Sequence, residues 1–176
     1  MDRKTIVLGA GPRARKAEGV VNVDIRPFSG IDVVHDLNER PWPFQDGEAY
    51  HVNATHILEH LERLPETMDE IWRILSPGGS LYVEVPIVTK ENLDLAFADP
   101  THRQFLRLHS FLNYFTVPAL LRPAGNESRY VKHAWCPAYV TPTWQAERDG
   151  ILRLLLFPVS DEWMENEELK QLYGIK

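Results

Sequence analysis

Short apolar runs recur along the first half of the chain, and each stops at a turn or at a polar residue. Several are rich in β-branched residues, and buried strands of a parallel sheet read as continuous apolar runs of this kind. We therefore predict parallel strands at residues 5–8, 19–24, 31–37, 51–55 and 81–86.

One segment has the period of a helix instead. In residues 66–75, Met68, Ile71, Trp72 and Leu75 stand at i, i+3, i+4 and i+7, which places them on one helical face. Ser76-Pro77-Gly78-Gly79 follows and predicts a helix stop with a tight turn into the next strand.

The last third of the chain predicts a different edge to the sheet. Residues 143–147 and 151–157, separated by a turn at Asp149-Gly150, are typical of a β-hairpin. Residues 162–173 then read as a helix that either covers the domain or forms a dimer contact. The expected fold is α/β: a doubly wound, Rossmann-like, mostly parallel sheet with an antiparallel edge hairpin. We expect a single domain over residues 1–176, with 86–135 as a substrate-facing insertion.

The turn after the first strand, Gly9-Ala10-Gly11, is the first candidate for ligand binding. Glycine lets backbone N–H groups approach a ligand closely because no Cβ intervenes. The next strand ends at Asp24. Open α/β sheets bind ligands at the carboxyl ends of their strands, and a carboxylate there suits the two hydroxyls of a ribose. A lone Gly-x-Gly also follows strands in proteins that bind no cofactor, so its context has to decide.

An NAD-binding fold is the natural alternative. It requires Gly-x-Gly-x-x-Gly at the start of a helix and an acid about 20 residues further on. Here residues 13–16 are Arg-Ala-Arg-Lys, so the third glycine is missing, and Asp24 comes early. The first crossover, residues 9–19, also leaves room for no more than one helical turn, since parallel connections generally need a dozen or more residues.

Three stretches together carry a resemblance to a known family. They are the glycine turn leading to Asn22-Val23-Asp24, the segment Thr55-His56-Ile57-Leu58-Glu59-His60-Leu61, and the helix–Pro-Gly-Gly–strand unit. In this order, from Leu8 to Val85, they resemble the small class I S-adenosylmethionine-dependent methyltransferases. The resemblance implies S-adenosylmethionine as cofactor. It assigns cofactor binding to a backbone turn, to a carboxylate that binds the ribose, to residues that contact the adenine and to residues that border the methionine part. The residues assigned are Gly9, Ala10, Gly11, Asp24, Ile25, Asp36, Leu37, Thr55 and His56.

The segment Ala98-Asp99-Pro100-Thr101-His102 also occurs in the related small enzymes, where it would lie over the methyl end of the cofactor. His102 is the expected proton acceptor, because imidazole titrates near neutral pH, with Asp99 orienting it and His60 in reserve. The expected function is methyl transfer to a small-molecule acceptor, such as a sugar or another hydroxyl compound. A cofactor-binding module or regulatory subunit without turnover is the alternative, which the short first crossover favours.

The remaining observations limit metals, partners and compartment. His56 and His60 are spaced i, i+4, which predicts that both lie on one helical face and is also the spacing of zinc ligands. The zincin motif has Glu where Ile57 stands, so no metal is expected. A formal net charge of −6 disfavours a nucleic-acid partner. The single cysteine, Cys136, indicates a reducing compartment, and no apolar run has the length of a membrane span. We expect a cytoplasmic protein of open oligomeric state, homodimer included.

Overall fold

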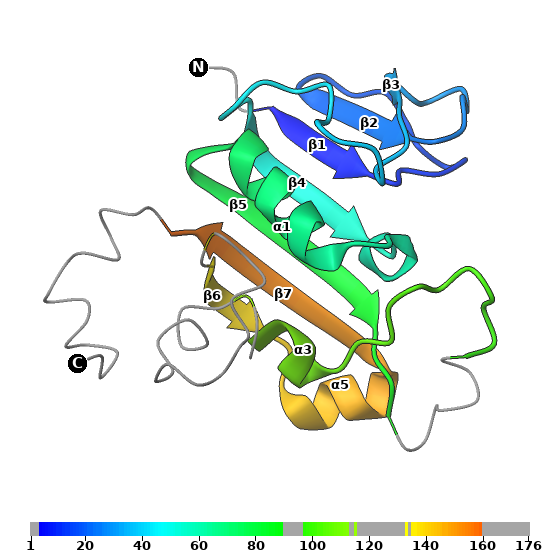
Figure 1. Ribbon diagram of the computed structural model, residues 1–176, viewed down its shortest axis with the longest axis vertical. Helices are drawn as coiled ribbons and strands as arrows, with labels where there is room; N and C mark the ends of the chain where they lie inside the picture. Colours follow the sequence, from blue (N-terminus) through cyan, green and yellow to red (C-terminus); the bar gives the residue numbers. More distant parts are fainter. Residues whose placement is uncertain (1–3, 90–96, 113–114, 116–132, 134, 160–176) are drawn as a thin grey trace, which may run out of the picture.

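The computed structural model describes residues 4–89, 97–112, 115, 133 and 135–159. Its strands are β1 (Thr5–Leu8), β2 (Val20–Asp24), β3 (Val33–Val34), β4 (Ala49–Thr55), β5 (Leu75–Pro86), β6 (Trp135–Val140) and β7 (Ile151–Pro158). Its helices are the 3₁₀ turn η1 (Leu58–His60), α1 (Leu64–Ile74), α3 (Leu108–Leu112) and α5 (Thr143–Asp149). The strands form one seven-stranded sheet in the order β3-β2-β1-β4-β5-β7-β6 (Figure 1).

The pairing directions confirm the predicted fold class. β1 pairs in parallel with β2 on one side and β4 on the other, and the β2–β3 and β4–β5 pairs are parallel too. β7 lies antiparallel between β5 and β6. Because the chain moves outward from β1 in one direction and then returns to start β4 on its other side, the sheet is doubly wound.

The sheet is fully buried on one face only. The apolar side of β5 and β7 presents Leu81, Val83 and Leu154, which are inaccessible to solvent and share the hydrophobic core with Met68 and Ile71 of α1. Figure 1 shows α1 lying across β4 and β5. The alternate positions of the same strands are half-buried, so the strands are not covered on both faces as their apolar runs suggested.

The short crossovers explain this asymmetry. Within the described residues, the connections β1–β2 and β2–β3 contain turns and no helix, as predicted for residues 9–19. Right-handed crossovers on the two sides of β1 lie on opposite faces of the sheet. The face opposite α1 therefore lacks crossover helices in this part of the chain. Polar contacts occur there instead: Tyr82 Oη and Arg153 Nε both donate to Glu84 Oε2, each at 2.9 Å.

The predicted antiparallel edge is present, but one arm of the predicted hairpin was wrong. Residues 143–149 form helix α5, and the antiparallel neighbours of β7 are β5 and β6. Gly150 ends the helix in the left-handed conformation, with φ of 66°, and its N–H donates to Ala146 O. An Asp-Gly pair serves a helix C-terminus as well as a hairpin turn, and Gln-Ala-Glu-Arg before it favours a helix.

Other boundaries moved by smaller amounts. The strand predicted over residues 31–37 is reduced to β3, at the edge of the sheet, because Asp36 closes a turn by accepting the N–H of Asn38. The helix predicted over residues 66–75 is α1, which starts two residues earlier. The helix predicted over residues 162–173 lies outside the described residues, and none of the described helices is both long and apolar enough to cross a membrane.

A buried carboxylate fastens α1 to the segment before β4. Glu70 Oε1 accepts the backbone N–H of Trp42 at 2.7 Å, and both oxygens of Glu70 accept from Arg73. Trp42 is itself almost fully buried, as expected for a core residue, and its indole N–H donates to Leu37 O. Burial alone would raise the pKa of Glu70, but the hydrogen bonds from Arg73 and Trp42 outweigh it, so the pKa lies below its ordinary value.

We predict that Glu70→Ala lowers the free energy of unfolding by about 2–3 kcal/mol, because it leaves the Trp42 N–H and the Arg73 guanidinium without their buried acceptor. Urea unfolding followed by tryptophan fluorescence measures the loss. Asp46→Ala is the matched control, since Asp46 also pairs with Arg73 but its side chain is 83% exposed. The control should lose less than about 1 kcal/mol.

The pair of Glu70 and Arg73 also makes the free energy of unfolding depend on pH. A carboxyl group whose pKa is depressed by folding stabilises the protein above its unfolded-state pKa, and this contribution is lost as pH falls through the lower folded-state value. The Glu70→Ala difference should therefore be full near pH 7 and shrink in acid. Equal losses in Glu70→Ala and Asp46→Ala would contradict the assignment.

Candidate active site

A groove opens at the carboxyl ends of the first strands. Its volume is about 190 Å³, and it is lined from the ends of β1, β2 and β3 and from the loop that follows β4. Its lining residues are Gly9, Asp24, Ile25, His35, Asp36, Leu37, Asn38, Ile57, His60 and Leu61. The chain reverses its direction across the sheet at β1, so the loops after β1 and β4 separate and leave a crevice at this point.

The groove gathers most of the residues assigned from the sequence to a cofactor. Gly9, Asp24, Ile25, Asp36 and Leu37 line it although they come from three different loops. His60, the reserve catalytic candidate, lines it too. The other four, Ala10, Gly11, Thr55 and His56, are not among its lining residues.

Asp24 holds the glycine turn against the end of β2. Its Oδ2 accepts the N–H of Gly11 at 2.8 Å, and its Oδ1 accepts the N–H of Arg26 at 2.9 Å. A carboxylate offers about four lone-pair sites, so these two bonds leave acceptor capacity for ligand hydroxyls. Gly9 has a φ of 61°, and a Cβ there would lie 2.6 Å from Ile57 Cδ1, so this position requires glycine.

The groove also has apolar walls. Ile25, directly after Asp24, is 60% exposed, whereas Leu37 is buried beneath the opposite side. Asp36 has a local role, because its Oδ1 caps the turn at Asn38. An exposed apolar side chain beside convergent carboxylates is the mixture expected of a site for a flat, partly polar ligand.

The prediction that His56 and His60 share a helical face was wrong. His56 precedes η1 and has a φ of 51°, and its N–H donates to Glu84 O, which prolongs the pairing of β4 with β5. Its ring instead faces two carboxylates: Nδ1 is 3.4 Å from Glu59 Oε1, and Nε2 is 3.3 Å from Glu84 Oε1. A helix cannot start while the backbone still continues the sheet, so the two imidazoles diverge.

His60 pairs with His102 instead. The centroids of the two rings are 4.9 Å apart, with the planes at 67°. The segment that carries His102 is fastened to η1 by the backbone, since the N–H groups of Arg103 and Gln104 both donate to Glu59 O, at 2.7 and 2.9 Å. Two candidates that lie far apart in the sequence therefore meet beside the groove.

Asp99 contributes less to His102 than its position suggested. Its Oδ1 accepts both the backbone N–H and the hydroxyl of Thr101, at 2.8 and 2.6 Å, and these bonds lower the pKa of Asp99. Its other oxygen, Oδ2, is 3.8 Å from His102 Nε2, which is ion-pair contact rather than a hydrogen bond. Asp99 mainly closes its own turn.

Glu59 is the residue that the sequence reasoning missed. It is 1% exposed, and its Oε2 has no hydrogen-bond partner among the described residues. One donor atom each from Glu59, His60 and His102 lie within 4.8 Å of one another. The signal available in the sequence was Leu-Glu-His directly after a strand, where a charged residue enters an apolar stretch.

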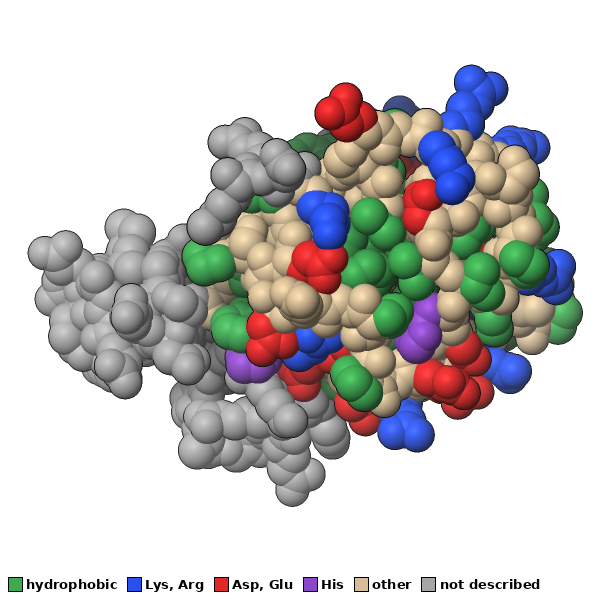
Figure 2. All heavy atoms as spheres, turned by 90° about the horizontal axis from the view of Figure 1, so that it is seen from above, with side chains coloured by type: hydrophobic (Ala, Val, Ile, Leu, Met, Phe, Trp, Pro, Cys, Tyr) green, Lys and Arg blue, Asp and Glu red, His purple; other side chains and the backbone are tan. Residues whose placement is uncertain are grey.

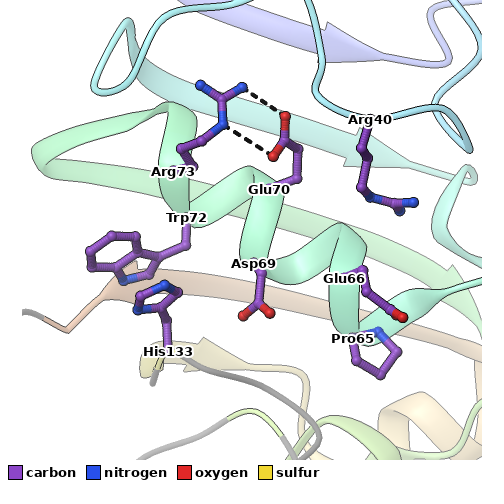
Figure 3. A pocket seen from close by; sticks show the side chains of 8 residues that line it. All are labelled: Arg40, Pro65, Glu66, Asp69, Glu70, Trp72, Arg73 and His133. Atoms are coloured by element: carbon purple, nitrogen blue, oxygen red, sulfur yellow. Dashed lines mark hydrogen bonds and ion pairs between the residues drawn. The ribbon is translucent and has the colours of Figure 1, made fainter.

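A larger cavity lies elsewhere, against the outer side of α1, and Figure 3 shows its lining. Trp72 stacks there on His133, with ring centroids 3.8 Å apart. Its acid–base pair, Glu70 and Arg73, is engaged in holding the fold. None of its lining residues lies in a strand, whereas the groove is lined from the strand ends, so the groove is the stronger candidate for chemistry.

The described basic side chains do not gather into a patch on the face seen in Figure 2. Figure 2 looks at the molecule from above Figure 1, and Lys and Arg side chains are scattered there among Asp and Glu, with apolar side chains near the centre. A nucleic-acid binder would gather its basic residues on one surface. This face has no such arrangement among the described residues.

The sequence was compared with protein families and with curated proteins. A family model described as a methyltransferase domain matches residues 12–83. A search of curated proteins finds no significant match.

Solved structures share the fold at low sequence identity. An S-adenosylmethionine-dependent methyltransferase from Archaeoglobus fulgidus has a TM-score of 0.59 at 16% identity, over 88% of this chain and 85% of that one. A Mesorhizobium loti S-adenosylmethionine-dependent methyltransferase has a TM-score of 0.55 at 13% identity, over 87% and 89%. A putative methyltransferase solved in complex with the Haloferax volcanii activator Trm112 has a TM-score of 0.55 at 16% identity, over 90% and 84%. Residues 12–83 are thus similar to a methyltransferase domain, and the chain shares its fold with solved S-adenosylmethionine-dependent methyltransferases.

Proposed function

We propose that the chain transfers the methyl group of S-adenosylmethionine to a hydroxyl of a small-molecule acceptor, a sugar being the favoured kind. The observation that carries the proposal is the groove, in which a glycine turn, a strand-end carboxylate and apolar walls meet. The domain match to methyltransferases supports it.

In this proposal the cofactor lies along the groove. Asp24 accepts the ribose hydroxyls, and the turn around Gly9, Ala10 and Gly11 lies against the methionine part. Ile25 and Leu37 enclose the adenine, and Asp36 faces its amino group. Thr55 and His56 are weaker candidates for the methionine border, because neither lines the groove and His56 is paired with two carboxylates.

The acceptor is proposed to approach from the side of His60 and His102, with Asp99 at its edge. An oxygen lone pair attacks the sulfonium methyl carbon while the C–S bond breaks, and the electron pair stays on sulfur as a neutral thioether. The reaction needs the acceptor oxygen to be aligned with the methyl carbon, and the hydroxyl has to lose its proton. A group on the side of His60 and His102 would assist the loss of this proton. The net charge of −6 favours a small molecule over a nucleic acid as the acceptor.

Two further parts of the proposal come from the sequence. Residues 86–135 form the insertion that contacts the acceptor, within a single domain spanning the chain. The single cysteine, Cys136, supports a cytoplasmic location.

We predict that Asp24→Ala weakens the binding of S-adenosylmethionine at least ~10-fold, because a hydrogen bond to a charged group is worth roughly 1.5–3 kcal/mol. Isothermal titration calorimetry with S-adenosylmethionine and with NAD measures it, and NAD should not bind. Asp46→Ala, which removes an exposed carboxylate paired with Arg73 on the surface, is the control and should bind normally.

Asp24 also holds the glycine turn, so Asp24→Asn is measured alongside it. The amide keeps one acceptor oxygen and has nearly the same shape. Its NH₂ group cannot accept the second backbone N–H, so it should show an affinity and a melting temperature between those of Asp24→Ala and the parent chain. Unchanged affinity in a folded Asp24→Ala variant would overturn the cofactor assignment.

We predict that His102→Ala lowers turnover about 10²-fold or more, the range for a group that assists proton transfer, and leaves S-adenosylmethionine binding nearly intact. Formation of S-adenosylhomocysteine is followed with a panel of pyranosides and phenols. Asp46→Ala is the control, since Asp46 is exposed and lies outside both the groove and residues 86–135. Wild-type turnover in His102→Ala would make His102 structural. Cofactor binding with no turnover on any acceptor of the panel would favour the alternative, a cofactor-binding module.

A further inference from the structure

We infer that Glu59, His60 and His102 form a binding site for a divalent transition-metal ion, with Zn²⁺ the best fit to the donor set. One donor atom from each side chain lies within 4.8 Å of the other two. Two imidazoles and one carboxylate are the protein ligands of one class of catalytic zinc site, which keeps a further position open. Zinc ligands about 2.1 Å from the ion in a tetrahedron stand about 3.4 Å apart, so small side-chain rotations close the site.

The carboxylate of Glu59 is the independent observation that indicates a cation. Glu59 is 1% exposed, and the ring of His56 lies 3.4 Å from its Oε1. Its Oε2 is buried without a hydrogen-bond partner among the described residues. An unsatisfied buried carboxylate oxygen is costly, and metal coordination is one of the few arrangements that satisfies it.

The His60 imidazole is held from outside the cluster, and the His102 imidazole faces a carboxylate there. His60 Nδ1 lies 3.3 Å from the carbonyl oxygen of Thr101 and 3.1 Å from its hydroxyl. His102 Nε2 faces Asp99 Oδ2 at 3.8 Å. Metal-binding histidines commonly present one ring nitrogen to a carbonyl or carboxylate oxygen, which fixes the ring while the other nitrogen faces the ion.

The backbone joins the two halves of the site. Glu59 O accepts the N–H groups of Arg103 and Gln104, so the residue after His102 is bonded directly to a ligand-bearing turn. The cluster is therefore set by the fold rather than by sequence spacing. The expectation of no metal was drawn from His56 and His60, whereas the structure pairs His60 with His102.

The site adjoins the groove, because His60 belongs to both. An ion there has an open position for an acceptor oxygen and lowers the pKa of a hydroxyl bound to it. Metal binding itself does not rest on the proposed methyl transfer, so the two inferences can fail separately.

The test uses the full chain, purified without an affinity tag and freed of metal, titrated with Zn²⁺ in a calorimeter. We expect one ion per chain, and His60→Gln and His102→Gln should each weaken binding at least ~10-fold. His109→Gln, which removes an exposed imidazole outside the cluster, should bind as the parent does. Mg²⁺, which prefers oxygen ligands, should bind far more weakly. Absence of stoichiometric Zn²⁺ binding, or equal affinity in all variants, would overturn the inference.

A variant could also lose Zn²⁺ because it no longer folds, and its melting temperature shows whether it does. Zn²⁺ should raise the melting temperature of the parent chain and of His109→Gln, but not of His102→Gln. Glu59→Gln replaces the buried charge with an amide of similar shape and should also lose the shift. A chain that binds S-adenosylmethionine but no Zn²⁺ would contradict this inference alone. The reverse result would contradict the proposed function alone.

Discussion

The two hydrogen bonds accepted by Asp24 hold together the part of the molecule on which the groove depends. One oxygen binds the N–H of Gly11 and the other binds the N–H of Arg26, so the turn after β1 and the loop after β2 are fixed to one side chain. In a longer crossover the first turn of a helix would present its free N–H groups at this place. Here residues 9–19, all of which the structure describes, contain no helix between β1 and β2, and a carboxylate orders the turn instead.

The same shortening explains the one-sided sheet. Among the described residues, the crossovers β1–β2 and β2–β3 add no helix to the face opposite α1, and the same face of β5 and β7 carries the polar set of Tyr82, Glu84 and Arg153. Stability then rests on the face covered by α1, whose buried residues share the core with the strands. The Glu70 contacts matter for this reason, because they join α1 to the segment around Trp42 at the edge of that core.

Much of the fold could be predicted because it depends on local patterns. The β-branched runs gave β1 and β2, and the period of Met68, Ile71 and Trp72 gave α1. The prediction for residues 143–147 was wrong because an Asp-Gly pair is compatible with two structures, and only the pairing of β6 with β7 decides between them. The third strand shortened because its end closes a turn at Asp36.

The candidate site was predictable in part for a related reason. Residues placed at strand ends, such as Gly9 and Asp24, meet because parallel strands end at one edge of the sheet. The partner of His60 was not predictable from spacing, since a helical period was assumed where η1 is only a 3₁₀ turn. The contact of His60 with His102 depends on the backbone bonds to Glu59 O, and no sequence pattern encodes them.

Glu59 brings these points together. Its backbone carbonyl positions the loop that carries His102, while its side chain places a nearly inaccessible carboxylate beside two imidazoles. Desolvation of a carboxylate costs several kcal/mol unless a cation or hydrogen-bond donors compensate it. His56 faces one oxygen of Glu59, but that ring is shared with Glu84. A cation bound by the three side chains would therefore stabilise the fold. Because the loop that carries His102 supplies one of the ligands, binding of the cation would also stabilise the position of that loop beside the groove.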